Sequence, residues 1–302
     1  MSASPASRIL VFGDAMIDVT VELHEQLRIG SDTRGVVTSQ GGGSAGNTAA
    51  WLAKVGCDVT FLGRVGEDGG AHEFRESLLA MGVKPSLVVD STRATGVCVC
   101  LIDDSGERSM VPSAGANAGW SLNDVERVNL LDFGHLHISA YPMLRVETAA
   151  PARALIEAAH AGGLSVSVDP ASYGPLEDFG AEAFLNAVGQ VDVLLPDTRE
   201  MQVLADTQDV RAGIEFLLKF ARVVVVKQGA KGATAGVRGG AVIEAAGEAH
   251  RAARDTTGAG DAFAAGFLSA WLNNFELSQC LRAGNQLAAD AVQLIGGRPT
   301  SK

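Results

Sequence analysis

The sequence predicts an α/β fold, with a mostly parallel central sheet, helices on both faces and a small β-sheet that forms a lid. Beyond residue 147, apolar runs of strand length alternate with longer amphipathic segments, which is typical of parallel strands joined by helices. Hydrophobic residues make up 47% of the 302 residues and 36 are glycine, enough for one large core with many tight turns. No repeat and no linker interrupts the pattern, so residues 1–302 are expected to form a single domain.

The elements of the main sheet follow one another along the chain. The first is the short apolar run 8–13, which has the composition of a buried parallel strand. Later runs of the same character lie at 58–65, 133–138, 164–168, 191–195 and 222–227. Segments with helical periodicity lie at 48–54, 70–81, 147–160, 181–188, 200–204, 211–220 and 264–272.

Two stretches depart from this alternation and predict the lid. Four short segments look like antiparallel strands that stand away from the main sheet: 19–23, 36–39, 95–102 and 109–112. The last two flank a turn at 103–106, which is a hairpin pattern. We expect lid insertions at about 15–40 and 95–113. Their exposed edges could pair with a second copy, so a homodimer through the lid is one expected assembly.

Charge and composition exclude several classes of partner. The net charge of −11 argues against nucleic acid, because phosphate backbones attract basic surfaces. No apolar run approaches the roughly 18 residues of a membrane span, and the N-terminal segment lacks the apolar core of a signal peptide. Four scattered cysteines suit a reducing compartment. We therefore expect a cytoplasmic protein with small-molecule partners, without a nucleic-acid or membrane partner.

The segment 254–263 carries the strongest chemical signal. Gly258 and Gly260 precede a buried helix, and they are expected to turn the chain at its N-terminus, where free amides attract anions. Asp261 would repel such an anion unless it takes a proton from a group that attacks the anion. This points to phosphoryl transfer, with Asp261 as base and the amides of Gly258, Ala259 and Gly260 holding the phosphate. In the alternative interpretation, Asp261 only favours the helix start electrostatically.

Other polar residues follow predicted strands, where open α/β sheets bind ligands. Asp18 follows the first strand, and Asp169 ends the strand 164–168, where it either faces the site or closes a turn. A glycine cluster at 41–43 leads into a helix. The chain contains no G-x-x-x-x-G-K-[ST] loop and no G-x-G-x-x-G fingerprint after a strand, which disfavours a P-loop protein and a Rossmann dehydrogenase.

Two pairs of potential metal ligands are expected to be structural. His135 with His137, and Cys98 with Cys100, each lie two residues apart on a predicted strand. No further Cys or His ligands follow the cysteines at the spacing of a zinc site. A paired structural role therefore explains the histidines, and burial as small apolar residues explains the cysteines.

The string D-T-T-G-A-G-D-A-F at 255–263 resembles the C-terminal signature of the ribokinase-like (PfkB) family of carbohydrate and nucleoside kinases. G-x-V-G-x-D at 63–68 resembles part of the family's N-terminal signature, and G-A-N-A at 115–118 resembles its segment returning from the lid. These motifs and those below extend from residue 9 to residue 300. The resemblance implies a ribokinase-like fold over nearly the whole chain.

The resemblance also implies an acceptor site at the base of the lid. Four residues match family positions that bind sugar hydroxyls: Asp18, Gly42, Gly43 and Asn47. Met16, Ser44 and Tyr141 stand where ribokinases carry Asn, Lys and Glu. Tyr141 is thus expected to contact the acceptor, and these departures argue against a ribokinase.

For the nucleotide, the resemblance implies a site along the neighbouring strand ends. Asp197 and Glu200 resemble the family's N-x-x-E motif, which organises Mg²⁺ and phosphate through water, with Asp197 in place of Asn. Asp197 could equally cap a helix. Lys227, Gly229 and Gly232 match the nucleotide-binding turn, and Asn285 lies where the family places a residue beside the adenine.

A monovalent-cation site is implied next to the anion hole. Asp255 and Thr257 stand where the family supplies cation-binding oxygens, and a C-terminal loop completes the site. The matching positions in that loop are Ala291, Leu294, Gly296 and Thr300.

Together these features predict an ATP-dependent kinase that phosphorylates a hydroxymethyl group of a small sugar or sugar acid. The expected cofactors are ATP and Mg²⁺, with K⁺ as a further candidate. A nucleoside kinase of the same family is one alternative. A catalytically silent sugar or nucleotide sensor on this fold is another, which the intact Asp261 disfavours.

Overall fold

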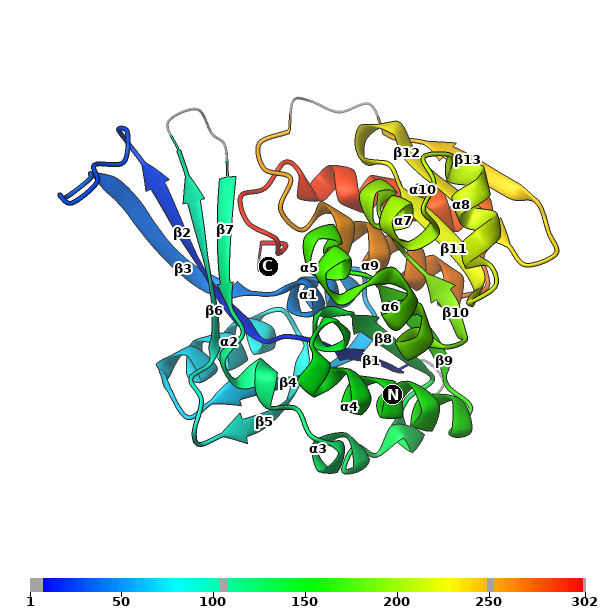
Figure 1. Ribbon diagram of the computed structural model, residues 1–302, viewed down its shortest axis with the longest axis horizontal. Helices are drawn as coiled ribbons and strands as arrows, with labels where there is room; N and C mark the ends of the chain where they lie inside the picture. The colour runs from blue at the N-terminus through cyan, green and yellow to red at the C-terminus, as the bar shows by residue number, and fades with distance from the viewer. Residues whose placement is uncertain (1–7, 104–107, 249–252, 301–302) are drawn as a thin grey trace.

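The computed structural model describes residues 8–103, 108–248 and 253–300. Its larger sheet has nine strands (Figure 1). In order across the sheet they are β13 (Val242–Ala246), β12 (Gly232–Val237), β11 (Ala221–Lys227), β10 (Val191–Leu194), β9 (Ser165–Asp169), β8 (His135–Ser139), β1 (Arg8–Phe12), β4 (Asp58–Gly66) and β5 (Lys84–Asp90). All neighbours from β11 to β5 are parallel, and only the pairs β11–β12 and β12–β13 are antiparallel. The predicted mostly parallel sheet is confirmed.

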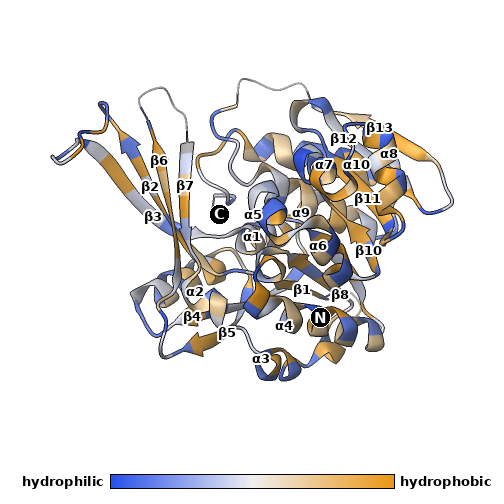
Figure 2. Ribbon diagram, viewed as in Figure 1, coloured by the Kyte–Doolittle hydropathy of each residue, from blue (hydrophilic) through white to orange (hydrophobic). Residues whose placement is uncertain are grey.

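Helices cover both faces of this sheet, as predicted. One face carries α1 (Ser44–Lys54), α2 (Gly69–Ala80), α9 (Ala259–Leu272) and α10 (Leu277–Ala291). The other carries α3 (Leu122–Glu126), α4 (Val146–Ala161), α5 (Tyr173–Phe179), α6 (Ala181–Val188), α7 (Thr198–Ala205) and α8 (Val210–Leu217). Successive side chains of a strand point to opposite faces, so in β1 Val11 packs in the first core and Leu10 in the second. Strands buried on both faces can be apolar throughout, as the orange colour along β11 shows (Figure 2).

The smaller sheet forms the predicted lid, and it projects from the main body (Figure 1). Its strands in order are β3 (Gly35–Gly42), β2 (Met16–Leu23), β6 (Gly96–Ile102) and β7 (Arg108–Ser113). The predicted pairs β2–β3 and β6–β7 are antiparallel, and β2 joins β6 in parallel because both strands enter the lid from the main sheet in the same direction. Cys98 and Cys100 are both buried. Most of the predicted turn at 103–106 lies outside the described residues, as does the segment 1–7.

Some helices and strands were not predicted from the sequence or begin at a different residue. The strands β5, β12 and β13 and the helix α5 were not predicted, and α1 begins at Ser44 rather than at residue 48. β12 has the composition G-A-T-A-G-V, whose small residues give little strand signal. The first turn of α1 contains Ser44 and Gly46, which have weak helix propensity. Among the described residues, no helix combines the length and the apolar character needed to span a membrane.

Candidate active site

Asp261 lies in the first turn of α9, at the carboxyl edge of the sheet. Its Oδ1 accepts a hydrogen bond from the Ser44 hydroxyl (2.7 Å), and its Oδ2 accepts one from Asn47 Nδ2 (2.9 Å). Both donors belong to α1, so two helix N-termini meet at this carboxyl group. Burial raises the pKa of Asp261 to about 6, and the two hydrogen bonds oppose that rise. A carboxyl group with such a pKa can accept a proton near neutral pH.

The start of α9 has the geometry of an anion site. Gly258 is the N-cap residue with φ 73°, and a Cβ atom there would lie 2.5 Å from the backbone of Gly297. Only glycine satisfies both conditions, so the C-terminal segment packs directly against this turn. The Ala259 amide donates to the Thr256 carbonyl (3.3 Å), and the amides of Gly258 and Gly260 lie at the same helix start, where a helix lacks internal acceptors. Lys227 Nζ lies 3.4 Å from the position that a Cβ atom on Gly260 would occupy, so an ammonium group adjoins the same turn.

The predicted acceptor residues converge at the base of the lid. Asp18 lies on β2, and a Cβ atom on Gly42 would lie 2.0 Å from its carboxylate, so glycine is required opposite this acid. Burial raises the pKa of Asp18 to about 6, while the positive charge of Arg298 and the Gly43 amide counteract the rise. Gly43 has φ 80° and caps α1, which carries Asn47. The structure thus brings Asp18, Gly42, Gly43 and Asn47 together next to Asp261.

Tyr141 lies at the same site, in the 3₁₀ turn after β8. Burial raises the pKa of its phenol, the nearby charge of Asp261 adds to the rise, and a hydrogen bond with Ser172 opposes it. Arg145 follows in the same segment and binds both carboxylate oxygens of Asp14 (3.2 and 2.5 Å). Asp14 is only 4% exposed, so this bidentate pair is a buried ion pair close to Tyr141.

A buried charge network joins the ends of three parallel strands. Lys227 Nζ forms an ion pair of 2.5 Å with Asp169 Oδ2, which shows that Asp169 faces the site instead of only closing a turn. Asp197 and Glu200 cap α7 reciprocally: Asp197 Oδ1 accepts from the Glu200 amide (2.8 Å), and Glu200 Oε2 accepts from the Asp197 amide (2.7 Å). Burial raises the pKa of Glu200 to about 8, and the charge of Lys227 opposes that rise.

This network fits a divalent cation held partly through water. The carboxylates of Asp197 and Glu200 each use one oxygen for helix capping, and hard oxygen ligands are what Mg²⁺ prefers. In the described parts of the chain, no three or more His, Cys, Asp or Glu side chains converge on a single metal position. A Mg²⁺ ion here would therefore need water and phosphate oxygens to complete its coordination.

The predicted nucleotide turn follows β11. Gly229 and Gly232 have φ 58° and 98°, and a Cβ atom on Gly232 would lie 2.2 Å from the carbonyl oxygen of Ala245. Asn285 on α10 donates hydrogen bonds to the carbonyl oxygens of Ala245 (3.2 Å) and Ala246 (2.9 Å). The turn and Asn285 therefore both adjoin the C-terminal end of β13.

Part of the predicted monovalent-cation site assembles. Asp255 is buried, and its two carboxylate oxygens accept hydrogen bonds from the amides of Thr257 (2.7 Å) and Gly296 (2.8 Å). The carboxylate thus ties the C-terminal loop to the segment before the anion hole. The other predicted ligands lie in or next to that loop: Ala291 ends α10, Leu294 donates its amide to the Ala291 carbonyl (2.9 Å), and Thr300 is exposed.

Arg298 is the functional-site residue that sequence reasoning missed. The residue is 8% exposed, and its guanidinium donates to Asn47 Oδ1 (3.3 Å), to Ser77 Oγ (2.7 Å) and to the Gly42 carbonyl (2.9 Å). It also lies over the ring of Phe74, 5.1 Å from the centroid. No local signal marks it, because an arginine between glycine and proline near a chain end usually indicates an exposed tail.

The histidines of β8 are structural, as predicted. His135 bonds the hydroxyls of Ser165 and Ser167 (2.8 Å each), and His137 bonds Ser167 (2.8 Å). Burial lowers the pKa of both histidines to about 3, so they are neutral at physiological pH. They serve to pair β8 with β9 rather than as a base.

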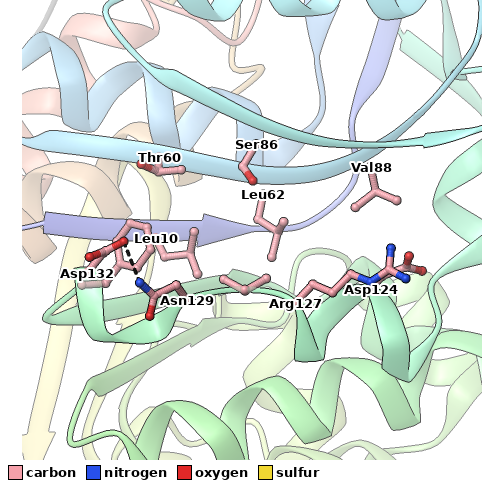
Figure 3. Close-up of a pocket in the computed structure, with 11 residues that line it drawn as sticks. Leu10, Thr60, Leu62, Ser86, Val88, Asp124, Arg127, Asn129 and Asp132 are labelled. Carbon is pink, nitrogen blue, oxygen red and sulfur yellow. Dashed lines mark hydrogen bonds between the residues drawn. The ribbon is translucent and has the colours of Figure 1, made fainter.

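A hollow of about 300 Å³ lies apart from this site. It opens between β1, β4 and β5 and the segment around α3, and its floor includes Leu10, Leu62 and Val88 (Figure 3). Polar side chains of Asp124, Asn129 and other residues form its rim. None of the predicted site residues lines this hollow.

The chain is similar to known proteins over nearly its whole length. The sequence profile described as "pfkB family carbohydrate kinase" matches residues 6–302. An ATP-dependent ribose-1-phosphate kinase from Halopiger xanaduensis is 31% identical over 295 residues, which cover 96% of this chain and 94% of that protein.

Solved structures show the same fold. A probable sugar kinase from Rhizobium etli CFN 42 superposes with a TM-score of 0.87 at 23% identity, covering 99% of this chain and 97% of that one. Arabidopsis thaliana ribokinase, solved with ribose and ATP, has a TM-score of 0.81 at 25% identity, covering 96% and 94%.

Proposed function

The chain belongs to the pfkB family of carbohydrate kinases, and we propose on that premise that it transfers the terminal phosphoryl group of ATP to a hydroxymethyl group of a small sugar or sugar acid. The observation that carries this proposal is the placement of Asp261. Its carboxyl group, with a pKa raised to about 6, adjoins the amides of the first turn of α9. A proton acceptor next to an anion site is the arrangement that transfer of a phosphoryl group to an alcohol needs.

In the proposed reaction, the acceptor hydroxyl attacks the terminal phosphorus of ATP. Its proton passes to Asp261, a new O–P bond forms, and the bond to the bridging oxygen breaks, so ADP leaves. The amides of Gly258, Ala259 and Gly260 stabilise the negative charge on the transferred group. Mg²⁺ near Asp197 and Glu200 would neutralise charge on the phosphates.

The acceptor is proposed to bind under the lid, between Asp18 and Tyr141. A buried carboxylate can accept two hydroxyl donors, which orients a sugar. Gly42 leaves room for the Asp18 carboxylate that would bind the acceptor, and Asn47 lies beside the base. Closure of the lid would exclude water that otherwise hydrolyses ATP.

A sugar phosphate is a second candidate acceptor. The relative from Halopiger xanaduensis is named for ribose 1-phosphate, and in this chain the guanidinium of Arg145 lies beside Tyr141. The guanidinium of Arg145 could bind an anionic substituent of the acceptor while it remains paired with Asp14.

For the remaining cofactors, we propose that the turn at Lys227, Gly229 and Gly232 holds the phosphates and ribose of ATP, with Asn285 beside the adenine. The hydrogen bonds around Asp255 support a K⁺ site in the adjoining loop. A cytoplasmic location follows from the same function, since ATP is abundant there.

We also propose a homodimer through the lid. Four apolar side chains are exposed on its edge strands β3 and β7: Val36, Val37, Met110 and Val111. Pairing would bury them. The molar mass measured by light scattering would be that of two chains, and Val37→Lys combined with Val111→Lys would reduce it to that of one.

A panel of acceptors tests the proposed activity. ADP release is measured with sugars, sugar acids, sugar phosphates and nucleosides, and the product is identified by mass spectrometry. Asp261→Asn is expected to lower turnover by roughly 10²–10⁴-fold with modest loss of ATP binding. Unchanged turnover in this variant would reject Asp261 as the base, and absence of ADP release with every acceptor would favour a sensor.

A further inference from the structure

Arg298 brings a buried positive charge to the place where the lid, α1 and α9 meet. Each nitrogen of its guanidinium has a different hydrogen-bond acceptor: Nε donates to Asn47, Nη1 to Ser77 and Nη2 to the carbonyl of Gly42. These partners belong to α1, α2 and β3. One side chain from the C-terminal segment therefore links three elements of the acceptor site.

The surrounding backbone leaves space for this group. A Cβ atom on Gly41 would lie 2.6 Å from Nη1, and one on Gly46 would lie 2.5 Å from Nη2. The ring of Phe74 covers one face of the guanidinium. Two glycines and an aromatic ring thus form a slot that matches a planar fork, which a lysine would fill poorly.

Tethering of the C-terminal segment does not require this charge. Trp51 Nε1 already donates to the carbonyl of Gly297 (3.0 Å), and the backbone of Gly297 packs on Gly258. Burying a guanidinium costs solvation free energy, which a purely structural contact could avoid by using apolar groups. Burial lowers the pKa of Arg298 to about 10, and the charges of Asp18 and Asp261 oppose that fall.

The contact with Asn47 decides how the base is held. The Asn47 amide has one acceptor and one donor end. Because Oδ1 receives the hydrogen bond from Arg298, Nδ2 points to Asp261 Oδ2. If the amide turned over, its oxygen would face the carboxylate and repel it. Arg298 and Asp261 therefore select the same orientation of the Asn47 amide from its two ends.

We propose that Arg298 is a positioning residue for phosphoryl transfer, which orients the Asn47 amide toward Asp261 and at the same time fixes the Gly42 carbonyl at the base of the lid. This inference rests on the proposed function, in which Asp261 is the base. It assigns to the C-terminal segment a direct role in aligning the base with the acceptor.

A double-mutant cycle tests whether Arg298 acts on Asp261 through Asn47. Arg298→Met is expected to lower kcat about 10- to 100-fold, because small misplacements of a reacting group have costs of this order, with the KM for ATP little changed. Asn47→Ala should lower kcat to a similar extent. If Arg298 acts through Asn47, the double variant will be little worse than Asn47→Ala alone. If the reductions in kcat of the two single variants multiply in the double variant, Arg298 does not act through Asn47.

The titration of Asp261 provides a readout that a merely structural role would not move. The charged or ionisable groups facing it are Asp169, Lys227, Tyr141 and Arg298. Loss of Arg298 removes a nearby positive charge and releases the Asn47 donor, so the acid limb of kcat/KM should move to higher pH. An acid limb at the wild-type position would contradict the inference.

Two further variants separate positioning from folding. Arg298→Lys keeps the positive charge but not the planar set of guanidinium donors. Its kcat should fall nearly as far as that of Arg298→Met, while its thermal stability should be higher than that of Arg298→Met. Recovery of full kcat by Lys would overturn the geometric argument. The control Arg64→Met removes a partly buried arginine, paired with Asp90 and Asp124 away from the site, and should lower Tm without moving the pH profile.

The outcomes distinguish the inference from the function on which it rests. A wild-type protein that phosphorylates no acceptor overturns both. An active wild type whose turnover and pH profile are unchanged by Arg298→Met overturns only the inference and leaves the proposed kinase activity standing.

Discussion

The Ser44 hydroxyl donates a hydrogen bond of 2.7 Å to Asp261 Oδ1 although 217 positions separate the two residues. Ser44 opens α1 and Asp261 lies in the first turn of α9, so the bond joins the helix with the proposed acceptor residue Asn47 to the helix with the proposed anion site. The carboxylate is consequently held in one orientation before any substrate binds.

Removing this hydrogen bond should shift the pH dependence of catalysis. The bond favours the ionised form of Asp261 and lowers its pKa, so Ser44→Ala should raise that pKa above the present value of about 6. Because the base must be ionised, the acid limb of kcat/KM is expected to move to higher pH, with activity at high pH less affected. The measurement is a pH profile of both proteins, and a shift to lower pH would contradict the assigned role of Ser44.

Asp18 is expected to reduce stability at neutral pH. Its pKa is raised in the folded protein, to about 6 from 3.8, so the folded state binds more protons than the unfolded state between these values. Stability is therefore greatest below the unfolded pKa and declines as pH rises through about 6. Asp18→Asn should raise the free energy of unfolding at pH 7 by at most about 3 kcal/mol, and far less at pH 4.

Thermal or urea unfolding at both pH values checks this effect. The exposed Asp32→Asn serves as control and should change stability little at either pH. The same Asp18→Asn variant should lose acceptor affinity, a trade between stability and activity. Equal stabilisation at pH 4 and pH 7 would show that burial of the charge is not the cause.

Gly258→Ala should impair both folding and transfer. A Cβ atom there meets the backbone of Gly297 at 2.5 Å, and the residue has φ 73°. We expect a loss of about 1–3 kcal/mol in stability, and a lower kcat because the amides of the anion site must shift. Gly69→Ala at the start of α2 is the matched control, since a Cβ atom there contacts nothing within 4 Å. Equal Tm values for the two variants would contradict the packing argument.

Removing Lys227 should leave the buried carboxylate of Asp169 without its partner. Lys227→Met is expected to cost about 3–5 kcal/mol in stability, the range typical of breaking a buried ion pair. Lys227→Met combined with Asp169→Asn should recover much of this loss, because neither variant side chain carries a charge. Chemical denaturation of the two variants measures the difference, and a double variant no more stable than the single one would argue against the pairing.

The fold class and the position of Asp261 after a glycine turn at a helix start could be predicted because their signals are local. Alternating strand and helix patterns specify a parallel sheet, and Gly258, Gly260 and Asp261 are close neighbours in sequence. The same holds for Asp197 and Glu200, whose spacing of three residues is that of a helix cap. The short elements β5, β12 and α5 were missed because their few, small or mixed side chains carry weak periodicity.

By itself, the sequence determined that this chain builds an α/β sheet with a lid and that a glycine turn followed by Asp261 opens a buried helix. Only the tertiary structure decided which side chains surround that acid. Ser44, Asn47 and Arg298 come from both ends of the chain, and Asp169 meets Lys227 across 58 positions. The physical reason is that helix and strand periodicity depend on neighbours along the chain, whereas a hydrogen bond or ion pair depends on distances in space, which are set only when the sheet has assembled and brought the strand ends to one edge.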